Sequence, residues 1–389
     1  MDAALFAQIL SDNSWMDLRE LGYKYPGVDM GELVALFKTS VYKTLPLADF
    51  RGNALVYADS TAHVDIRTLK LLLTPQKPGS SYGLRAMEDE IASTLAIERI
   101  DFDRDSVRKI LQGYAPADRR EERIFGIKKG LAFIADPTNA ISEESIFTLY
   151  DMTVGRYLNE TDRLKAGEKY RHDAVYVMGQ DIEHAGLSHL ELPAYMRRFV
   201  DFTREDSPMD DLLKAAVIHF YLAYLHPYFD GNGRMARLMH MWFLQRQGYP
   251  STMFVPFSGY IERSRKQYYD AFSLVEANTR ISHVTDVTPF LAYFVEHVYN
   301  KIDSPAARPD TLRAFTQALE SGSITAKERD LWGFVLSAYG AGEFSTKQLE
   351  RDFGNAAYAT IRGFVLKFCE LGLLKAQKYG SRIRYSVAV

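Results

Sequence analysis

Cysteine is nearly absent from this sequence: among 389 residues there is one, Cys369. A single cysteine excludes an internal disulfide and any cysteine-based zinc cluster, and it is typical of a reducing compartment. The net charge is also small, at −3, so composition alone indicates neither nucleic acid nor a membrane as a partner. Long apolar runs are missing, and residues 1–15 lack the basic flank of a signal peptide. We therefore expect a cytoplasmic protein without membrane contact.

What the sequence does contain is typical of folded domains, with 47% hydrophobic and 25% charged residues. The length allows two or three domains. No repeat period or low-complexity stretch is present, which argues against a solenoid. Helical periodicity dominates and predicts a mainly α fold, with helices over residues 86–100, 105–114, 142–158 and 210–225.

Local signals add detail to this fold. Asp105 is expected to cap the second of these helices and Ser142 the third. Alternating apolar residues predict short strands at 54–58 and 174–179. Two prolines and several small residues interrupt the pattern at 302–310, which we interpret as the boundary between a helical body and a C-terminal module.

The C-terminal module has a distinct predicted order of helices and strands. Helices are predicted over 326–340, 345–353 and 355–371, with Ser345 capping the second, and two strands follow in 373–389. This order resembles a winged helix-turn-helix domain. The third helix carries an apolar face made of Ile361, Phe364, Val365 and Phe368.

Basic residues outnumber acidic ones over 345–389, eight against three. Such an excess favours contact with DNA phosphates. Binding to a protein and packing as a homodimer are the alternatives, because a fold does not settle a function. The basic residues are Lys347, Arg351, Arg362, Lys367, Lys375, Lys378, Arg382 and Arg384.

The most informative stretch is 226-HPYFDGNGRMAR-237, which lies between two helical runs. Gly231 and Gly233 flank Asn232 and allow successive backbone N–H groups to form an anion nest, before a helix that is expected to start near Arg234. Arg237 lies three residues beyond Arg234, so both can reach one phosphate-bearing ligand.

Two further residues of this stretch carry chemistry. His226 can act as a base near neutral pH. Asp230 is a hard oxygen ligand that suits the Mg²⁺ accompanying a nucleotide. A base, a metal carboxylate, a phosphate nest and two arginines within twelve residues indicate nucleotidyl or phosphoryl transfer.

Two other interpretations of this region are weaker. The pattern Gly231-x-Gly233-x-x-Ala236 matches a dinucleotide-binding fingerprint, but that motif follows a strand and this one follows a helix. His219 and His240, with His226, raise the question of a metal site. No Glu or Cys completes a ligand set at helical spacing, so we expect His219 and His240 in the core or on the surface.

The same stretch resembles the signature of the Fic family (filamentation induced by cyclic AMP), His-Pro-Phe/Tyr-x-Asp/Glu-Gly-Asn-Gly/Lys-Arg with a further Arg three residues on. The resemblance covers about residues 80–300: 170–177 is similar to the family's target-docking flap and 259–272 to its post-motif helix. It implies a Fic-type helical core with a small β-hairpin flap, and AMP transfer from ATP to a Tyr, Thr or Ser hydroxyl of a target protein.

The resemblance also implies residue roles. His226 would deprotonate the target hydroxyl, Asp230 would bind Mg²⁺, and Phe229 would lie in the core. ATP phosphates would be bound by Gly231, Asn232, Gly233, Arg234 and Arg237. The related death-on-curing kinases carry Lys where this sequence has Gly233. A nucleotide-sensing DNA-binding regulator, and a Fic-core enzyme with another transfer activity or one that removes AMP, remain alternatives.

A second family feature lies upstream of the motif. Many relatives carry an inhibitory helix with Ser/Thr-x-x-x-Glu-Gly/Asn, whose Glu pairs with the second motif arginine. Here Thr94 and Glu98 fit that pattern, and Arg99 departs from it. The resemblance thus implies an autoinhibitory pair between Glu98 and Arg237.

These features give a domain plan. Residues 1–115 form an N-terminal helical region that includes the inhibitory helix (about 86–100), and 116–300 form the Fic core. Residues 301–310 are a linker, and 311–389 form the winged-helix domain.

Overall fold

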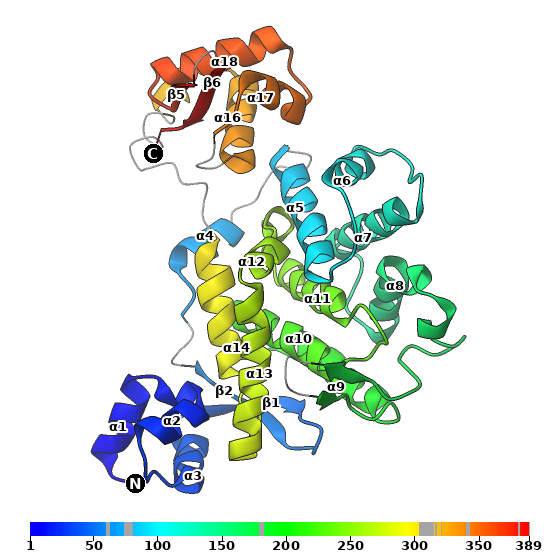
Figure 1. Cartoon of the computed structure of the whole chain (residues 1–389), viewed down its shortest axis with the longest axis vertical. Coiled ribbons are helices and arrows are strands. Elements are labelled where there is room, and N and C mark those ends of the chain that lie inside the picture. The colour runs from blue at the N-terminus through cyan, green and yellow to red at the C-terminus, as the bar shows by residue number, and fades with distance from the viewer. Residues whose placement is uncertain are drawn as a thin grey trace.

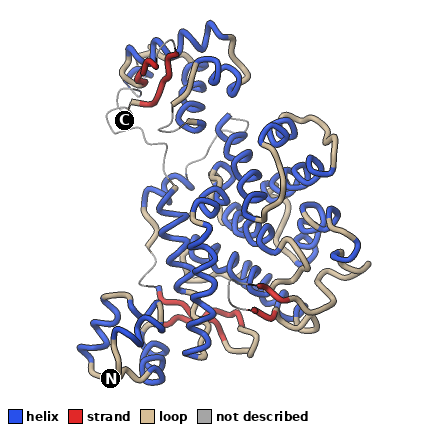
Figure 2. The backbone as a smooth tube through the Cα atoms, viewed as in Figure 1, coloured by secondary structure: helices blue, strands red, loops and turns tan. Residues whose placement is uncertain are grey.

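The fold is that of a computed structural model, which describes residues 1–59, 63–73, 81–178, 183–302, 315, 317–319, 321–339, 343–379 and 382–388. Helices form most of this described chain, as the periodicity predicts. The described strands pair into antiparallel two-stranded hairpins (Figure 2). None of the helices in these ranges is long and apolar enough to cross a bilayer.

The N-terminal helices α1 (Ala3–Ser11), α2 (Leu18–Lys24) and α3 (Met30–Ser40) gather at one end of the molecule (Figure 1). The carboxylates of Asp17 and Asp29 accept backbone N–H bonds at the starts of α2 and α3, which fixes where these helices begin. The helices enclose a small core of Ile9, Trp15, Leu21, Leu33 and Phe37.

A hairpin joins these helices to the body. Its strands are β1 (Tyr42–Ala48) and β2 (Ala54–Ala58), with Tyr42 opposite Ala58. The strand predicted at 54–58 is thus confirmed. The sequence analysis missed β1, which contains Pro46 and two exposed polar residues, features that weaken a strand signal.

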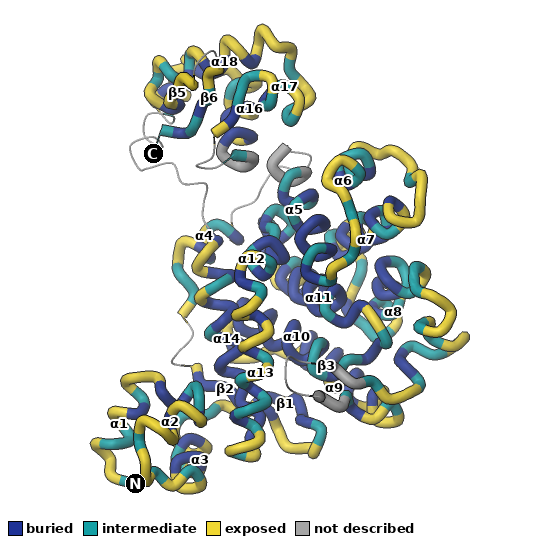
Figure 3. Tube along the Cα trace, in the orientation of Figure 1, coloured by how far each residue is buried: buried dark blue, intermediate teal, exposed yellow. Residues whose placement is uncertain are grey.

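The body is built around two buried helices. α10 and α11 pack side by side, and both are dark along most of their length in the burial view (Figure 3). An apolar surface on nearly every face of α10 accounts for its central place. The body helices are α4 (Ile66–Leu73), α5 (Ser81–Ile97), α6 (Arg104–Leu111), α7 (Arg119–Ala135), α8 (Glu143–Thr153), α9 (Leu192–Arg204), α10 (Asp211–Leu225), α11 (Asn232–Arg246), α12 (Phe257–Arg263), α13 (Arg265–Ser282) and α14 (Thr288–Tyr293).

Short elements complete the body. The hairpin β3 (Tyr176–Met178) and β4 (Glu183–Ala185) lies where the flap is expected, with Tyr176 opposite Ala185. The end of the strand predicted over 174–179 lies outside the described residues. Single helical turns occur at Ser14–Met16, Gly155–Tyr157, Glu160–Asp162, Thr252–Phe254 and Tyr299–Lys301, and a π-helical turn at Phe294–Val298.

The C-terminal module has a separate hydrophobic core, to which Leu331, Val335 and Leu349 contribute. Ser345 caps α17 as predicted, and the predicted apolar face of α18 (Ile361, Phe364, Val365, Phe368) is buried. α16 contacts α5, so the module touches the body at the start of that helix (Figure 1). The elements are α16 (Ala326–Ala338), α17 (Thr346–Phe353), α18 (Tyr358–Glu370), β5 (Leu374–Tyr379) and β6 (Arg382–Val387).

Several predicted boundaries were wrong. Asp103, not Asp105, caps α6, because its carboxylate accepts the N–H of Ser106. The helix predicted over 142–158 ends at Thr153, although Ser142 caps it as expected. α11 begins two residues before Arg234. Most of the predicted 301–310 linker lies outside the described residues.

Candidate active site

The site centres on the loop that joins α10 to α11. His226 ends α10 with φ 51°, and Gly231 precedes α11 with φ 83°. Glycine is required at the second position, since a Cβ there would lie 2.6 Å from Val154 Cγ1. The loop therefore leaves one helix and enters the next through two left-handed residues.

Tyr228 and Asn232 hold this loop in shape. The Asn232 side chain accepts the N–H of Tyr228 at 3.0 Å and donates to its carbonyl at 2.8 Å. The Tyr228 ring stacks on Tyr150 with centroids 3.6 Å apart. The expectation that Phe229 lies in the core was wrong: Tyr228 is fully buried, while Phe229 is half-buried with its ring edge against His172.

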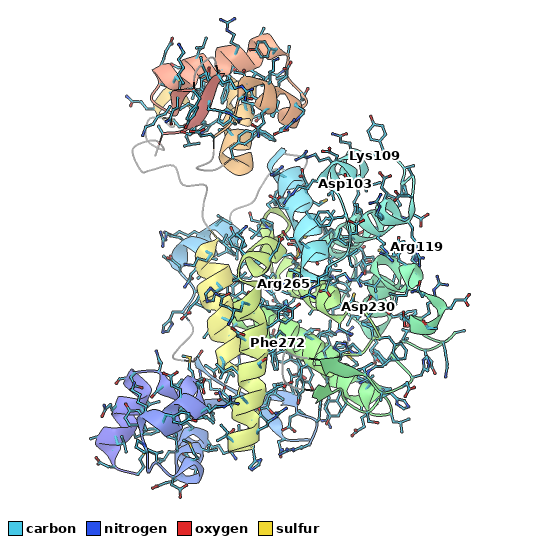
Figure 4. All side chains as sticks on the ribbon, viewed as in Figure 1. Asp103, Lys109, Arg119, Asp230, Arg265 and Phe272 are labelled. Carbon is cyan, nitrogen blue, oxygen red and sulfur yellow. The ribbon has the colours of Figure 1, made fainter. Side chains whose placement is uncertain are left out.

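Both motif arginines are buried at the start of α11. Arg234 donates to the Asp230 carboxylate at 3.0 Å, and Asp230 itself stays half-exposed at the loop (Figure 4). Two buried donors, Arg234 Nε and Arg237 Nη1, have no hydrogen-bond partner within the described residues. Free donors beside the N–H groups of a helix N-terminus attract an anion, as the sequence predicts for this position.

Arg237 is occupied on its other side by α5. Its Nε donates to the Thr94 hydroxyl at 2.8 Å, and its Nη2 lies 2.5 Å from Glu98 Oε1. Burial, the largest single effect, would lower the pKa of Arg237, but Glu98, Tyr268 and Glu90 together outweigh burial and the pKa is raised. The structure thus brings Arg237 together with Glu98, 139 positions away, and with Thr94, 143 positions away, as the family resemblance implies.

Gly233 leaves room for the Glu98 carboxylate to reach the Arg237 guanidinium. A Cβ at Gly233 would lie 2.5 Å from Glu98 Oε1 and 3.3 Å from Arg237 Nη1. The residue that separates this sequence from the lysine-bearing kinases therefore also leaves room for the Glu98 carboxylate.

Arg99 adopts the backbone that explains the usual Gly or Asn at its position. It lies just past the end of α5 with φ 55°. Its N–H bonds to Ala96 O at 3.1 Å and the Ile100 N–H to Leu95 O at 3.0 Å, which is the Schellman pattern of a helix C-terminus. Arginine is accommodated because its side chain is exposed, and the turn that presents Glu98 still forms.

Sequence reasoning missed Glu90, which lies on α5 one turn before Thr94. Glu90 is buried, and its carboxylate accepts both the backbone N–H of Ser258, at 2.8 Å, and the Ser258 hydroxyl. Burial raises the pKa of Glu90. The spacing of four residues from Glu90 to Thr94 to Glu98 places all three on one helix face and could have pointed to Glu90.

A cavity beside the motif arginines is lined by Glu90, Thr94, Thr153, Arg234 and Arg237 together with apolar side chains.

The two other histidines belong to the core, one of the places in which they were expected. His219 Nε2 lies 2.8 Å from Tyr268 Oη, and His240 Nε2 lies 2.8 Å from Tyr299 Oη. Burial lowers the pKa of His240 to about 3. No cluster of metal-ligating side chains was found in the described part of the chain.

The segment that carries this site is similar to a known protein family. The model of the Fic/DOC family matches residues 140–244, which contain the loop and both arginines. These residues are similar to a Fic domain. Thr94 and Glu98 lie outside the matched segment, as does the C-terminal module.

Curated relatives carry the name protein adenylyltransferase Fic. The Drosophila willistoni protein is 29% identical over 150 residues, covering 38% of this chain and 26% of the relative. The Culex quinquefasciatus protein is 25% identical over 284 residues, covering 67% of this chain and 53% of the relative. The chain thus matches between about a quarter and a half of the length of these relatives.

Solved structures of Fic proteins are also similar. A Fic family protein from Desulfovibrio desulfuricans has a TM-score of 0.47 at 18% identity, covering 78% of this chain and 86% of its own. A Fic-domain signalling protein from Bacteroides thetaiotaomicron has a TM-score of 0.48 at 20% identity, covering 60% of this chain and 91% of its own.

Proposed function

We propose that this chain is a protein adenylyltransferase that transfers AMP from ATP to a Tyr, Thr or Ser hydroxyl of a target protein or of itself. The observation that carries the proposal is the pair of buried arginines at the start of α11, each with an unpartnered donor within the described residues. Curated relatives with that activity name support it. A cytoplasmic location, expected from the cysteine content, stays a prediction.

The chemistry assigned to the chain is a balanced transfer. His226 takes the proton from the target hydroxyl, whose oxygen attacks the α-phosphorus of ATP. A bond forms between that oxygen and the α-phosphorus, the bond from the α-phosphorus to its bridging oxygen breaks, and pyrophosphate leaves. Arg234 and Arg237 stabilise the charge on the departing phosphates, and the Gly231–Gly233 backbone binds them.

Asp230 fits a magnesium ion. Its carboxylate is half-exposed at the loop, and one carboxylate combined with nucleotide phosphates is a common way for proteins to hold Mg²⁺. When bound, Mg²⁺ neutralises phosphate charge. In the structure Asp230 instead pairs with Arg234, so nucleotide binding would release both groups for new partners.

We further propose that Glu98 inhibits this reaction. Its carboxylate occupies the Arg237 guanidinium that would bind the γ-phosphate, and Thr94 holds the same guanidinium from Nε. ATP bound with its γ-phosphate at Arg237 would therefore have to displace a carboxylate. This arrangement supports a chain whose basal activity is low.

Labelled ATP tests the proposed reaction. The Glu98→Gly chain should take up label from ATP marked at the α-phosphate and none from ATP marked at the γ-phosphate. Adding His226→Ala should abolish that labelling while ATP affinity, measured by calorimetry, stays near that of the parent. Label from the γ-phosphate would overturn the proposal in favour of phosphate transfer, and label lost from an AMP-modified protein would favour AMP removal.

The role of the C-terminal module remains a prediction. Lys347, Lys378 and Arg382 are exposed, which DNA contact requires. Two of the eight basic residues are already paired, Lys367 with Glu328 and Arg351 with Asp352. The basic surface is therefore smaller than the sequence count suggests, and target binding or dimerisation through this module stays open.

A further inference from the structure

A third buried arginine, besides Arg234 and Arg237, lies next to the motif loop. Arg171 is 2% exposed and precedes strand β3. Its Nε donates to the His226 carbonyl at 2.8 Å, its Nη1 to the Asp173 carbonyl at 2.7 Å, and its Nη2 to the Leu187 carbonyl. One guanidinium thus bonds the motif loop and the chain on both sides of the β3–β4 hairpin.

The backbone of Arg171 adds a fourth link. Its N–H donates to the Pro227 carbonyl at 2.8 Å. The carbonyls of two consecutive residues, His226 and Pro227, are therefore both held by Arg171. Rotation of the peptide unit that follows His226 would break the Nε bond.

These hydrogen bonds matter because His226 has an unfavourable backbone conformation. Its φ of 51° is left-handed, a conformation that is unfavourable for a residue with a side chain. Such a conformation persists only where the surroundings hold it in place. The hydrogen bonds from Arg171 to the His226 and Pro227 carbonyls supply that constraint.

The placement of the cation itself is costly. Burial lowers the pKa of Arg171, and a buried guanidinium is destabilising unless its donors are satisfied. An apolar side chain could fill the same space without that cost. The residue type is therefore explained by the carbonyls that it joins rather than by volume.

We propose that Arg171 is a positioning residue, which couples the chain on both sides of the β3–β4 hairpin to the backbone of His226 and so holds the base in the geometry that transfer requires. This inference rests on the proposed function. A displacement of about 1 Å between reacting groups can cost about 100-fold in rate. Loss of Arg171 should therefore slow transfer without weakening ATP binding, because its bonds reach neither motif arginine.

Gly186 offers an independent way to disturb the same contact. A Cβ at Gly186 would lie 3.0 Å from Arg171 Nη2 and 2.8 Å from Val175 Cγ2. Gly186→Ala therefore presses on the guanidinium from the hairpin side and leaves Arg171 itself intact. A shared effect of both variants would point to the coupling rather than to either residue alone.

The experiment uses the full chain with Glu98→Gly as parent. Into it we place Arg171→Gln, Arg171→Lys and Gly186→Ala. Arg204→Gln is the control for loss of an arginine–carbonyl contact elsewhere, because Arg204, exposed at the end of α9, donates to the Ile141 carbonyl. The rate of self-labelling at saturating α-labelled ATP and the ATP affinity by calorimetry are measured for each variant. We expect about a 10- to 100-fold lower rate for Arg171→Gln, with ATP affinity within about twofold of the parent.

The remaining variants sharpen the outcome. Arg171→Lys should recover part of the rate, since an ammonium keeps charge and donors but cannot reach all three carbonyls. Gly186→Ala should lower the rate, and Arg204→Gln should match the parent. A parental rate in both Arg171→Gln and Gly186→Ala, or a loss of rate that follows a loss of ATP affinity, would overturn the inference. If Arg171→Gln fails to fold, Gly186→Ala decides. An unlabelled parent would instead overturn the proposed function.

Discussion

The Glu98 carboxylate lies 2.5 Å from the Arg237 guanidinium, and Gly233 is the residue whose missing side chain allows that contact. Arg237 is almost fully buried, whereas about a quarter of the Glu98 side chain is exposed. The arginine is thus fixed in the helical body on α11, and the carboxylate approaches it from the end of α5. The contact can be broken by moving one helix end, without disturbing α11.

Removal of the Glu98 carboxylate is expected to activate the chain. Breaking a buried ion pair frees the other partner for a new anion. Glu98→Gly should raise self-labelling from ATP at least about tenfold, the effect of about 1.4 kcal/mol of lost competition. Glu98→Asp should raise it less, because the shorter side chain still carries the charge. The label incorporated per minute measures both.

Arg237→Ala is the control for that series. It should stay inactive with or without Glu98, because the reaction itself needs the guanidinium. Unchanged labelling in a well-folded Glu98→Gly chain would mean that α5 is only structural.

A substitution at Arg99 is expected to lower basal labelling, the opposite of the effect of Glu98→Gly. Its left-handed backbone is strained for arginine and free for glycine. Arg99→Gly should raise the free energy of unfolding by about 1 kcal/mol and lower basal labelling, because the turn that presents Glu98 becomes more stable. Arg99→Gln removes the charge but keeps the Cβ and should do neither. Chemical denaturation and labelling of the same preparations compare the two; equal behaviour would show that charge, not backbone strain, sets the effect.

Glu90 should act as the anchor of α5. Glu90→Ala leaves the Ser258 N–H buried without its acceptor, at a cost of about 1–3 kcal/mol, and should loosen the helix and raise basal labelling. Glu90→Gln keeps an acceptor for the N–H and a group that can bond the hydroxyl, so it should resemble wild type. Melting temperature and labelling rate separate the two. Equal labelling by Glu90→Ala and wild type would restrict Glu90 to stability.

The C-terminal hairpin provides a test of DNA contact. If the exposed lysine and arginine side chains of this hairpin bind phosphates, the full chain should bind duplex DNA at ~50 mM salt. Its affinity for DNA should then fall steeply as the salt concentration rises. Lys378→Ala together with Arg382→Ala should weaken binding and reduce the salt slope. Lys367→Ala is the matched control, since Lys367 is already paired with Glu328. Fluorescence anisotropy measures all three, and no binding at low salt would assign the module to protein contacts.

Much of this protein follows from local sequence. The helical periodicity, the caps at Ser142 and Ser345, the buried face of α18 and the α10–α11 loop all depend on residues a few positions apart. Interactions between residues a few positions apart can be recognised in the local sequence. Boundaries were less accurate, as at Asp105 and Thr153, because capping is decided by which nearby side chain reaches the free N–H groups.

Contacts between distant segments were decided by tertiary structure. Glu90 meets Ser258 across 168 positions, and Arg171 meets His226 across 55. No local pattern encodes such pairs, since each depends on how whole helices pack. The Glu98–Arg237 pair was expected only through a family resemblance. Packing of distant segments also decided that Tyr228, and not Phe229, is the buried aromatic residue of the loop. The order of residues thus defines which chemical groups are present, whereas packing defines which of them meet, because burial and hydrogen bonding act between neighbours in space.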